Sequence, residues 1–138
     1  MAKIKAKAKW VESIRSIADD TRSHSVVCDT SQTDGGADSG PSALELALMS
    51  LADCAVTIFA EIAKNSGIAL TKMEVEAEAE KKRGSPKISD VNLKVRVAGK
   101  ARQALLEAAW RRTEAGCPVM EIFKNPIPVN VQVEIVPE

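Results

Sequence analysis

The sequence has few of the residues on which common catalytic and metal sites depend. Its 138 residues contain one histidine, His24, and no tyrosine. A single histidine supports neither a multi-histidine metal site nor an ordinary Ser-His-Asp triad. No Cys-x-x-Cys pair occurs, which removes the thioredoxin-like and zinc-knuckle interpretations. The glycines at 35, 36 and 40 match neither a phosphate-binding loop nor a dinucleotide fingerprint. We therefore expect no metal and no cofactor.

The chain also lacks an excess of charge. Nineteen basic residues balance nineteen acidic ones, and aromatic residues make up 3% of the sequence. This composition favours neither a nucleic-acid partner nor an anionic membrane as partner. Lysines at positions 3, 5, 7 and 9 leave no apolar signal-peptide core near the N-terminus, and we expect them on the solvent side of a strand. We predict a cytoplasmic protein, a compartment in which thiols stay reduced.

The stretch from Gly35 to Gly67 organises the chain. A glycine-rich loop ends at Pro41, and Ser42 with Glu45 forms a Ser-x-x-Glu capping box that predicts the start of a helix. Gly67 is typical of a residue just beyond a helix C-terminus. Apolar residues cover more than half of this helix, which therefore has to be buried by its own sheet or by a second copy of the chain. Three acidic residues, at 45, 53 and 61, argue against a membrane span.

Alternating apolar and polar residues predict the strands around this helix. The expected strands cover residues 2–11, 14–18, 23–29, 70–82, 88–98 and 129–136, and the further helices cover 101–115 and 117–124. Gly84 and Pro86 mark the turn of a hairpin between residues 70 and 98. The length fits one domain, residues 1–138, with a core of its own. The sequence therefore predicts an α+β domain of order β-β-β-α-β-β-α-α-β.

The cysteines are the remaining candidates for chemistry. Cys54 lies in the middle of the long helix, and Cys117 lies 63 residues later at the start of a short helix. A helix N-terminus stabilises a thiolate and lowers the pKa of a thiol placed there. Both cysteines also fit the interpretation of small buried hydrophobes. We expect Cys28 to pack in the third strand, or to serve as an alternative resolving thiol.

At these residues the sequence resembles the OsmC/Ohr family of thiol-dependent peroxide reductases. Each matching motif is weak alone, whereas two cysteines at this separation in these contexts are specific, and the likeness is greater to the OsmC-like branch. The matching segments extend over essentially the whole chain: Gly-Gly-x-x-x-Gly-Pro-Ser (35–42), Glu-Leu (45–46), Ala-Asp-Cys (52–54), Ala-Lys-x-x-Gly-Ile (63–68) and Cys-Pro-Val (117–119).

The resemblance implies a mechanism and an assembly. Cys54 would attack an organic hydroperoxide or hydrogen peroxide and become a sulfenic acid, and Cys117 would resolve it as a disulfide. An external dithiol would then reduce that disulfide. The family also implies an intertwined homodimer, with the long helices at its centre and active sites at its interface. Its role would be defence against oxidative or osmotic stress.

The family further implies an arginine that holds the thiolate and polarises the peroxide, and a glutamate that orients the arginine. Glu45 is the candidate glutamate, although the family's glutamate more usually stands one position earlier, where this chain has Leu44. Glu45 also fits a purely structural role in the capping box. Arg22 is the candidate arginine, with Arg15 behind it, and an exposed turn arginine is the alternative interpretation.

One function of another class stays open beside the peroxidase. It is a non-enzymatic dimeric module with the same fold, which binds a small apolar ligand or a partner in the interface cleft. A lowered pKa of the Cys54 thiol would favour the enzyme, whereas inert buried thiols would favour the binding module. We expect His24 to be a strand side chain without a catalytic role, and Trp10 and Trp110 to be core or pocket wall.

Overall fold

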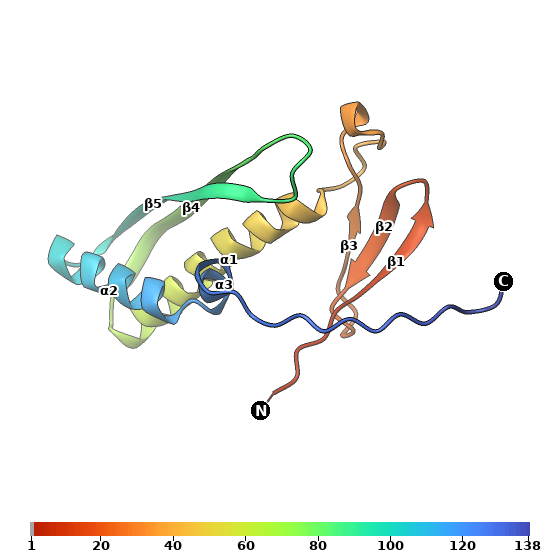
Figure 1. Cartoon of the computed structure of the whole chain (residues 1–138). Helices are drawn as coiled ribbons and strands as arrows, with labels where there is room; N and C mark the ends of the chain where they lie inside the picture. The colour runs from red at the N-terminus through yellow and green to blue at the C-terminus, as the bar shows by residue number, and fades with distance from the viewer. Residues whose placement is uncertain (1) are drawn as a thin grey trace. The chain divides into compact units, whose positions relative to one another are not determined.

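The computed structural model of the chain describes residues 2–138, which form two compact units, residues 2–50 and 51–138. The division falls within the longest helix, α1, so that each unit contains part of it. The elements in chain order (Figure 1) are β1 (Lys7–Glu12), β2 (Arg15–Asp19), β3 (Ser25–Cys28), the 3-10 helix η1 (Gln32–Asp34), α1 (Ala43–Asn65), β4 (Ala69–Lys81), β5 (Ile88–Lys100), α2 (Gln103–Gly116) and α3 (Pro118–Lys124).

The first unit is built on a three-stranded antiparallel sheet of order β1-β2-β3. The strands alternate small apolar and polar residues, and the register pairs Ala8 with Ala18 and Ala18 with Val26. Ala18, Val26 and Leu46 of α1 all line one shallow hollow, so this face of the sheet is the apolar one. The other face carries lysines of β1, as the alternation predicts. β1 and β3 are the two edges of the sheet.

The second unit is built on the hairpin of β4 and β5, whose residues pair antiparallel along almost their whole length. One face is apolar because Met73 and Val75 of β4 lie opposite Val97 and Val95 of β5. This face covers a core formed by Phe59 and Ala63 of α1 with residues of α2. A second core cluster consists of Leu51, Cys117 and Met120.

Helix α1 begins and ends with the signals that the sequence contains. Ser42 and Glu45 bond reciprocally at its start. At its end Gly67 adopts a φ of 70°, a left-handed conformation that glycine tolerates best, and the N–H of Ile68 bonds back to the carbonyl of Ala63 at 2.9 Å. The row Leu51, Ala55, Phe59 and Ala63 is buried, which makes α1 the core helix of the second unit.

The structure confirms the predicted α+β fold class and the element order as far as α3. One predicted element is wrong: residues 129–136 form no strand, and the segment after Lys124 leaves α3 as an extended chain (Figure 1). Its alternating side chains stay in water, and Ile135 is 88% exposed. Alternation predicts which residues share a face, but a strand needs a neighbouring strand to bond its backbone. That residues 1–138 form a single domain stays a prediction.

Candidate functional site

The second unit brings Cys54 and Cys117 into one apolar cluster. Cys117 is buried between α2 and α3 and caps the start of α3, where its carbonyl accepts a hydrogen bond from Glu121 N–H at 3.1 Å. Cys54 is half-buried on α1 and packs against the cluster that contains Cys117 and Met120. Both are free thiols. Two cysteines far apart in the sequence are therefore neighbours in this unit.

The surroundings of Cys54 disfavour its thiolate. Burial raises the pKa of the Cys54 thiol, and a hydrogen bond with Cys117 raises it further, while the N–H of Val119 acts in the opposite direction. The neighbouring Asp53 carboxylate adds a small increase. In this chain by itself the pKa of the Cys54 thiol is therefore raised and not lowered. An apolar cluster excludes the water that would solvate a negative sulfur, and the Val119 N–H alone does not compensate for it.

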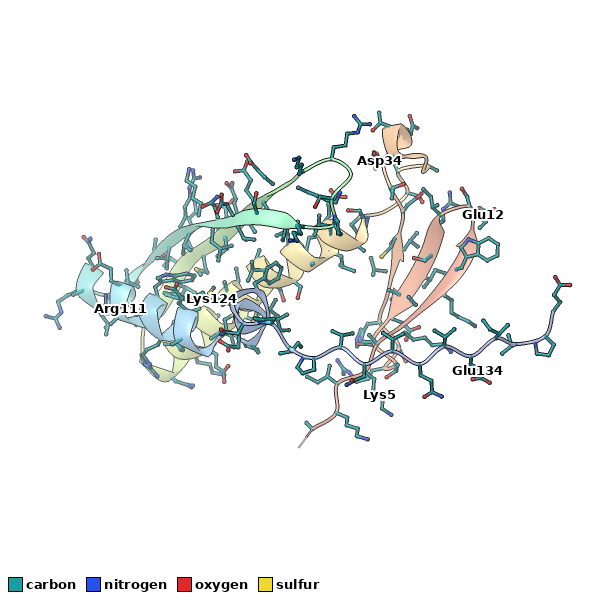
Figure 2. The ribbon with its side chains drawn as sticks, viewed as in Figure 1. Lys5, Glu12, Asp34, Arg111, Lys124 and Glu134 are labelled. Atoms are coloured by element: carbon teal, nitrogen blue, oxygen red, sulfur yellow. The ribbon has the colours of Figure 1, made fainter. Side chains whose placement is uncertain are left out.

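A cavity of about 740 Å³, lined by eight apolar and three charged residues, adjoins the cluster that contains the two thiols, and neither cysteine lines it. It shares Leu51, Met120 and Phe123 with the cluster around Cys117. An ion pair between Lys124 Nζ and Glu114 Oε1, 3.2 Å apart, joins α3 to α2 on its wall (Lys124 is labelled in Figure 2). The lining residues are Leu51, Ile88, Asp90, Val91, Leu93, Val95, Trp110, Glu114, Met120, Phe123 and Lys124. The volume and the walls suit an aliphatic or aromatic group of a small molecule.

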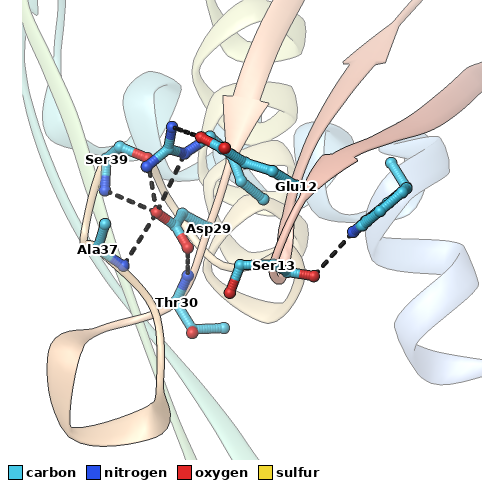
Figure 3. A network of polar contacts seen from close by, with 8 residues as sticks. Glu12, Ser13, Asp29, Thr30, Ala37 and Ser39 are labelled. Atoms are coloured by element: carbon cyan, nitrogen blue, oxygen red, sulfur yellow. Dashed lines mark hydrogen bonds and ion pairs between the residues drawn. The ribbon is translucent and has the colours of Figure 1, made fainter.

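In the first unit, Asp29 closes the glycine-rich loop that precedes α1 (Figure 3). The residue is 4% exposed, and its Oδ2 accepts hydrogen bonds from the hydroxyl and N–H of Ser39 and from Ala37 N–H. Its Oδ1 accepts one from Thr30 N–H at 2.8 Å. These hydrogen bonds hold the pKa of the Asp29 carboxyl well below its usual range. The bond from the Ser39 hydroxyl has the largest effect, followed by the bond from the Thr30 N–H. Asp29 thus determines how the chain enters α1.

The glycines of this loop are required by its close packing. A side chain at Gly36 would collide with the carbonyl oxygen of Thr30, and one at Gly40 would collide with the carbonyl oxygen of Val27. The N–H of Asp29 also donates to the carbonyl of Pro41 at 3.1 Å. The Gly-Gly-x-x-x-Gly-Pro motif is therefore the sequence of a loop that folds back on the end of β3.

Replacing Asp29 by asparagine is expected to lower stability in a pH-dependent manner. The folded pKa of Asp29 lies below the unfolded value of about 4, so the unfolded chain binds more protons as the pH falls. The Asp29 carboxylate therefore contributes its full stabilisation of the folded state above about pH 5. This stabilisation decreases as the pH falls through 4 toward the folded pKa. We would measure urea unfolding of the protein and of Asp29→Asn at pH 7, 5, 4 and 3. The difference between their free energies of unfolding should become smaller as the pH falls. Asp34→Asn, on the same loop but exposed, is the control, and a gap independent of pH would contradict the assignment.

The candidate arginines and the candidate glutamate lie in the first unit. Arg22 lies in the turn before β3 and not in the strand; its Nη2 lies 3.4 Å from Asp20 Oδ2, and its side chain is 75% exposed. Arg15 begins β2, where its Nη1 bonds Glu12 Oε1 at 2.9 Å and its buried Nε lies 3.7 Å from Asp29 Oδ2. Glu45 accepts from Ser42 N–H at 3.0 Å, and this bond is the main reason for its lowered pKa. The structural role of Glu45 in the capping box is confirmed.

Sequence reasoning missed Asp29 and most of the cavity wall. Of the two tryptophans predicted as core or pocket wall, Trp110 lines the cavity, whereas Trp10 is 74% exposed. Asp29 carries a local signal: an acidic residue that ends an apolar strand and opens a loop rich in Ser, Thr and Gly. The cavity has no local sequence signal, because its walls come from four elements, α1, β5, α2 and α3. His24 Nδ1 lies 2.6 Å from Asp20 Oδ2, beside a turn where the N–H of Arg22 lowers the pKa of Asp20 to about 2. That arrangement agrees with a structural histidine.

Comparisons with known proteins identify a matching family and solved structures with a similar fold. A family model described as OsmC-like protein matches residues 35–132, which is more than half of the chain. A crystal structure of an OsmC-like protein from Mycoplasma pneumoniae is similar at a TM-score of 0.79 and 15% identity, covering 91% of this chain and 89% of that one. An organic hydroperoxide resistance protein OsmC from Legionella pneumophila is similar at a TM-score of 0.66 and 14% identity, covering 90% of both chains.

A third structure is an OsmC-like hydroperoxide resistance protein from Jannaschia sp. CCS1, with a TM-score of 0.59, 15% identity and coverage of 93% and 89%. No curated protein matches the chain. At these identities the solved structures establish a shared fold.

Proposed function

Because the chain belongs to the family of OsmC-like proteins, we propose that it is a thiol-dependent peroxidase that reduces organic hydroperoxides, and hydrogen peroxide more slowly. The observation that carries the proposal is the pair of free thiols, Cys54 and Cys117, packed in one cluster that adjoins a cavity with mainly apolar lining residues. Hydroperoxide resistance is the described role of two structural relatives. The oxidative-stress role is part of the same proposal.

The reaction needs both thiols. The Cys54 thiolate attacks the outer oxygen of the peroxide; the O–O bond breaks, an alcohol leaves after taking a proton, and Cys54 becomes a sulfenic acid. The Cys117 thiol then attacks the Cys54 sulfur, which forms the disulfide and releases water. An external dithiol returns the pair to the reduced state through a mixed disulfide. No cofactor is needed, because the two sulfurs carry the two electrons.

A positive charge has to reach Cys54 for this chemistry to be fast at neutral pH. The groups that act on the Cys54 pKa in the second unit, Cys117, Val119 and Asp53, do not include a cation. We propose that Arg22 supplies the charge with Glu45 as its orienting carboxylate, and that Arg15 is the alternative donor. Arg15 is the more rigidly held of the two arginines, since it touches Glu12 and Asp29.

We propose that the working form is a homodimer in the cytoplasm. A monomer would leave much apolar surface in water: Met49 on α1 is 53% exposed, and Val131 in the C-terminal segment is 80% exposed. Large apolar side chains exposed in both units support an interaction with a partner. A second copy of the chain is the partner that the family resemblance implies.

The cavity favours peroxides that carry an apolar group. Hydrogen peroxide has no such group and gains nothing from the walls, whereas an alkyl or aryl group would replace water against Val91, Leu93 and Trp110. Placing that group in the cavity would orient the O–O bond beside the two thiols.

Filling the cavity is therefore expected to reduce activity selectively. Val95→Phe should raise the KM for cumene hydroperoxide by roughly tenfold. The added ring occupies space that the apolar group of the substrate would fill, so the substrate loses contacts with the cavity walls. The rate with hydrogen peroxide should stay unchanged. Val97→Phe is the matched control, since Val97 follows on the same face of β5 but does not line this cavity. Equal losses with both peroxides would show that the cavity does not bind the substrate.

The proposed function is tested by titrating the reduced protein with cumene hydroperoxide and with hydrogen peroxide, followed by intact mass and peptide mapping without reductant. One equivalent of cumene hydroperoxide should yield the Cys54–Cys117 disulfide within seconds. Thiols that stay free, or that oxidise only slowly to sulfinic acids, would exclude the peroxidase.

The raised Cys54 pKa favours a second candidate, a non-enzymatic module that binds a small apolar ligand in the same cavity. In that case the cysteines serve as small apolar side chains. Binding of a fluorescent aliphatic probe without thiol oxidation by either peroxide would support this module over the enzyme.

A further inference from the structure

A second groove lies between β5 and α2, and the proposed peroxidase does not use it. Its volume is about 440 Å³, which lies in the range of pockets that bind small molecules. Four half-buried apolar side chains line it: Val95 and Val97 of β5 with Leu106 and Trp110 of α2. None of the three cysteines is among the residues that line it. The groove is therefore a space apart from the two thiols.

One face of α2 gives the groove both apolar and polar neighbours. Residues three and four positions apart share a helix face, and the α2 residues that line the groove follow this spacing at 103, 106, 107, 110 and 111. Leu106 and Trp110 also pack against the core cluster that contains Phe59 and Ala109. Because the core holds these two side chains in place, the apolar wall exists before any ligand binds.

Arg111 places an exposed positive charge at this groove (the residue is labelled in Figure 2). Among residues 2–138, no hydrogen bond or ion pair engages its guanidinium. Glu107 stands four residues earlier, the spacing of a helical ion pair. Its Oε1 instead accepts a hydrogen bond from Gln103 Nε2 at 2.8 Å. The N–H donors of Arg111 are therefore available to a group from outside the chain.

We propose that this groove binds an anionic amphiphile, a carboxylate with an alkyl tail, as a second ligand site of the protein. The tail lies against Val95, Val97 and Leu106, where it covers apolar surface that water now contacts. The carboxylate pairs with Arg111, because a planar guanidinium binds a carboxylate through parallel, charge-assisted hydrogen bonds. This site goes beyond the proposed peroxidase and does not depend on it.

The larger cavity suits a carboxylate less well than the groove does. The lysine on its wall, Lys124, already pairs with Glu114 at 3.2 Å, and Asp90 adds a second carboxylate to the lining. A carboxylate bound there would meet two negative charges and one cation that has a partner. Charge complementarity therefore assigns the anionic ligand to the groove beside Arg111.

Trp110 can report on binding, because it lines the groove and is one of only two tryptophans in a chain without tyrosine. Trp10→Phe leaves Trp110 as the single tryptophan. Trp10 is 74% exposed and belongs to the first unit, so this substitution leaves the groove as it is. The fluorescence of the Trp10→Phe protein then comes from the groove wall.

The test is a fluorescence titration of the Trp10→Phe protein with sodium octanoate, below the concentration at which it forms micelles. Octanoate should change the Trp110 emission with saturation and bind at least about fivefold more tightly than octanol or octylammonium. Equal binding of octanol would show that no carboxylate is recognised. Tighter binding of octylammonium would assign the head-group contact to Glu107. Either result, or no change with any of the three compounds, would overturn the proposal.

A substitution at Arg111 tests the head-group contact. In the Trp10→Phe background, Arg111→Gln should weaken octanoate binding by roughly fivefold and leave octanol binding unchanged, because only the charge-assisted bonds are lost. Arg112→Gln is the matched control, since Arg112 is the next residue of α2 but does not line the groove, and its Nη1 lies 3.4 Å from Ser66 Oγ. Equal effects of the two substitutions would refute a specific contact with Arg111.

A second pair of variants locates the alkyl tail. Val97→Phe narrows the groove and should weaken octanoate binding, whereas Val91→Phe narrows the larger cavity and should leave it unchanged. The reverse order would place octanoate in the larger cavity and overturn the proposal. None of these titrations uses peroxide or reductant. Loss of octanoate binding therefore refutes only the groove site, and thiols that ignore peroxide refute only the peroxidase.

Discussion

Cys54→Ser is expected to abolish the formation of the disulfide by peroxide and to lower the peroxidase rate by roughly three orders of magnitude or more, as loss of a nucleophile does in other enzymes. A serine hydroxyl in the same apolar cluster does not ionise near neutral pH, and it can form neither a sulfenic acid nor a disulfide. Stopped-flow loss of cumene hydroperoxide under excess protein measures the first step without the external dithiol.

Cys117→Ser separates the two roles that the proposal gives to the thiols. This variant should consume one equivalent of peroxide and then stop, with Cys54 trapped as a sulfenic acid that a dimedone-type reagent labels. Cys28→Ser is the matched control, since Cys28 lies in β3 of the first unit. Full disulfide formation in Cys117→Ser would assign the resolving role to Cys28 and refute the proposed pair.

Phe59→Ala is expected to cause the largest loss of stability in the chain, about 3–5 kcal/mol of unfolding free energy. Phe59 is fully buried at 0% exposure and packs with Ala63, Ile68 and Ala109 in the core between α1, the hairpin and α2. The substitution removes the buried apolar contacts of the ring. It also leaves a cavity, because the surrounding helices and hairpin cannot easily move in to fill it. Urea unfolding followed by circular dichroism measures the loss.

Met49→Ala on the same helix is the control for this prediction. Met49 is half exposed, so in the monomer its truncation should change stability by less than about 0.5 kcal/mol. A similar loss for both variants, measured at a protein concentration where the chain is monomeric, would show that α1 has no preferred buried face. A loss for Met49→Ala that appears only at high concentration would place Met49 in the dimer interface.

Much of the fold was predictable because the signals are local. The capping box of Ser42 and Glu45 bonds as its residues predict. The alternation of apolar residues in 70–82 and 88–98 predicts the two strands of the β4–β5 hairpin and their apolar face, although not the two register shifts in their pairing. Pro118 predicts the start of α3 because its missing N–H and fixed φ suit the first helical position. Each of these signals acts over a few residues of chain.

The C-terminal segment shows where local signals fail. Val129, Val131 and Val133 alternate as a strand would, yet the segment has no regular structure. Its backbone has no neighbouring strand to bond, and no residue within the segment can supply one. The alternation therefore predicts a capacity to pair, and tertiary or quaternary partners decide whether pairing occurs.

For the candidate site, the sequence by itself determined the residue types, the helix positions of Cys54 and Cys117, and the loop that needs glycine. Only the tertiary structure decided that the two thiols share one cluster beside a cavity, that Asp29 closes the loop, and that burial raises the pKa of Cys54. The physical reason is that a pKa depends on solvation and on charges a few ångströms away. Those neighbours come from α1, β5, α2 and α3, which no local pattern relates.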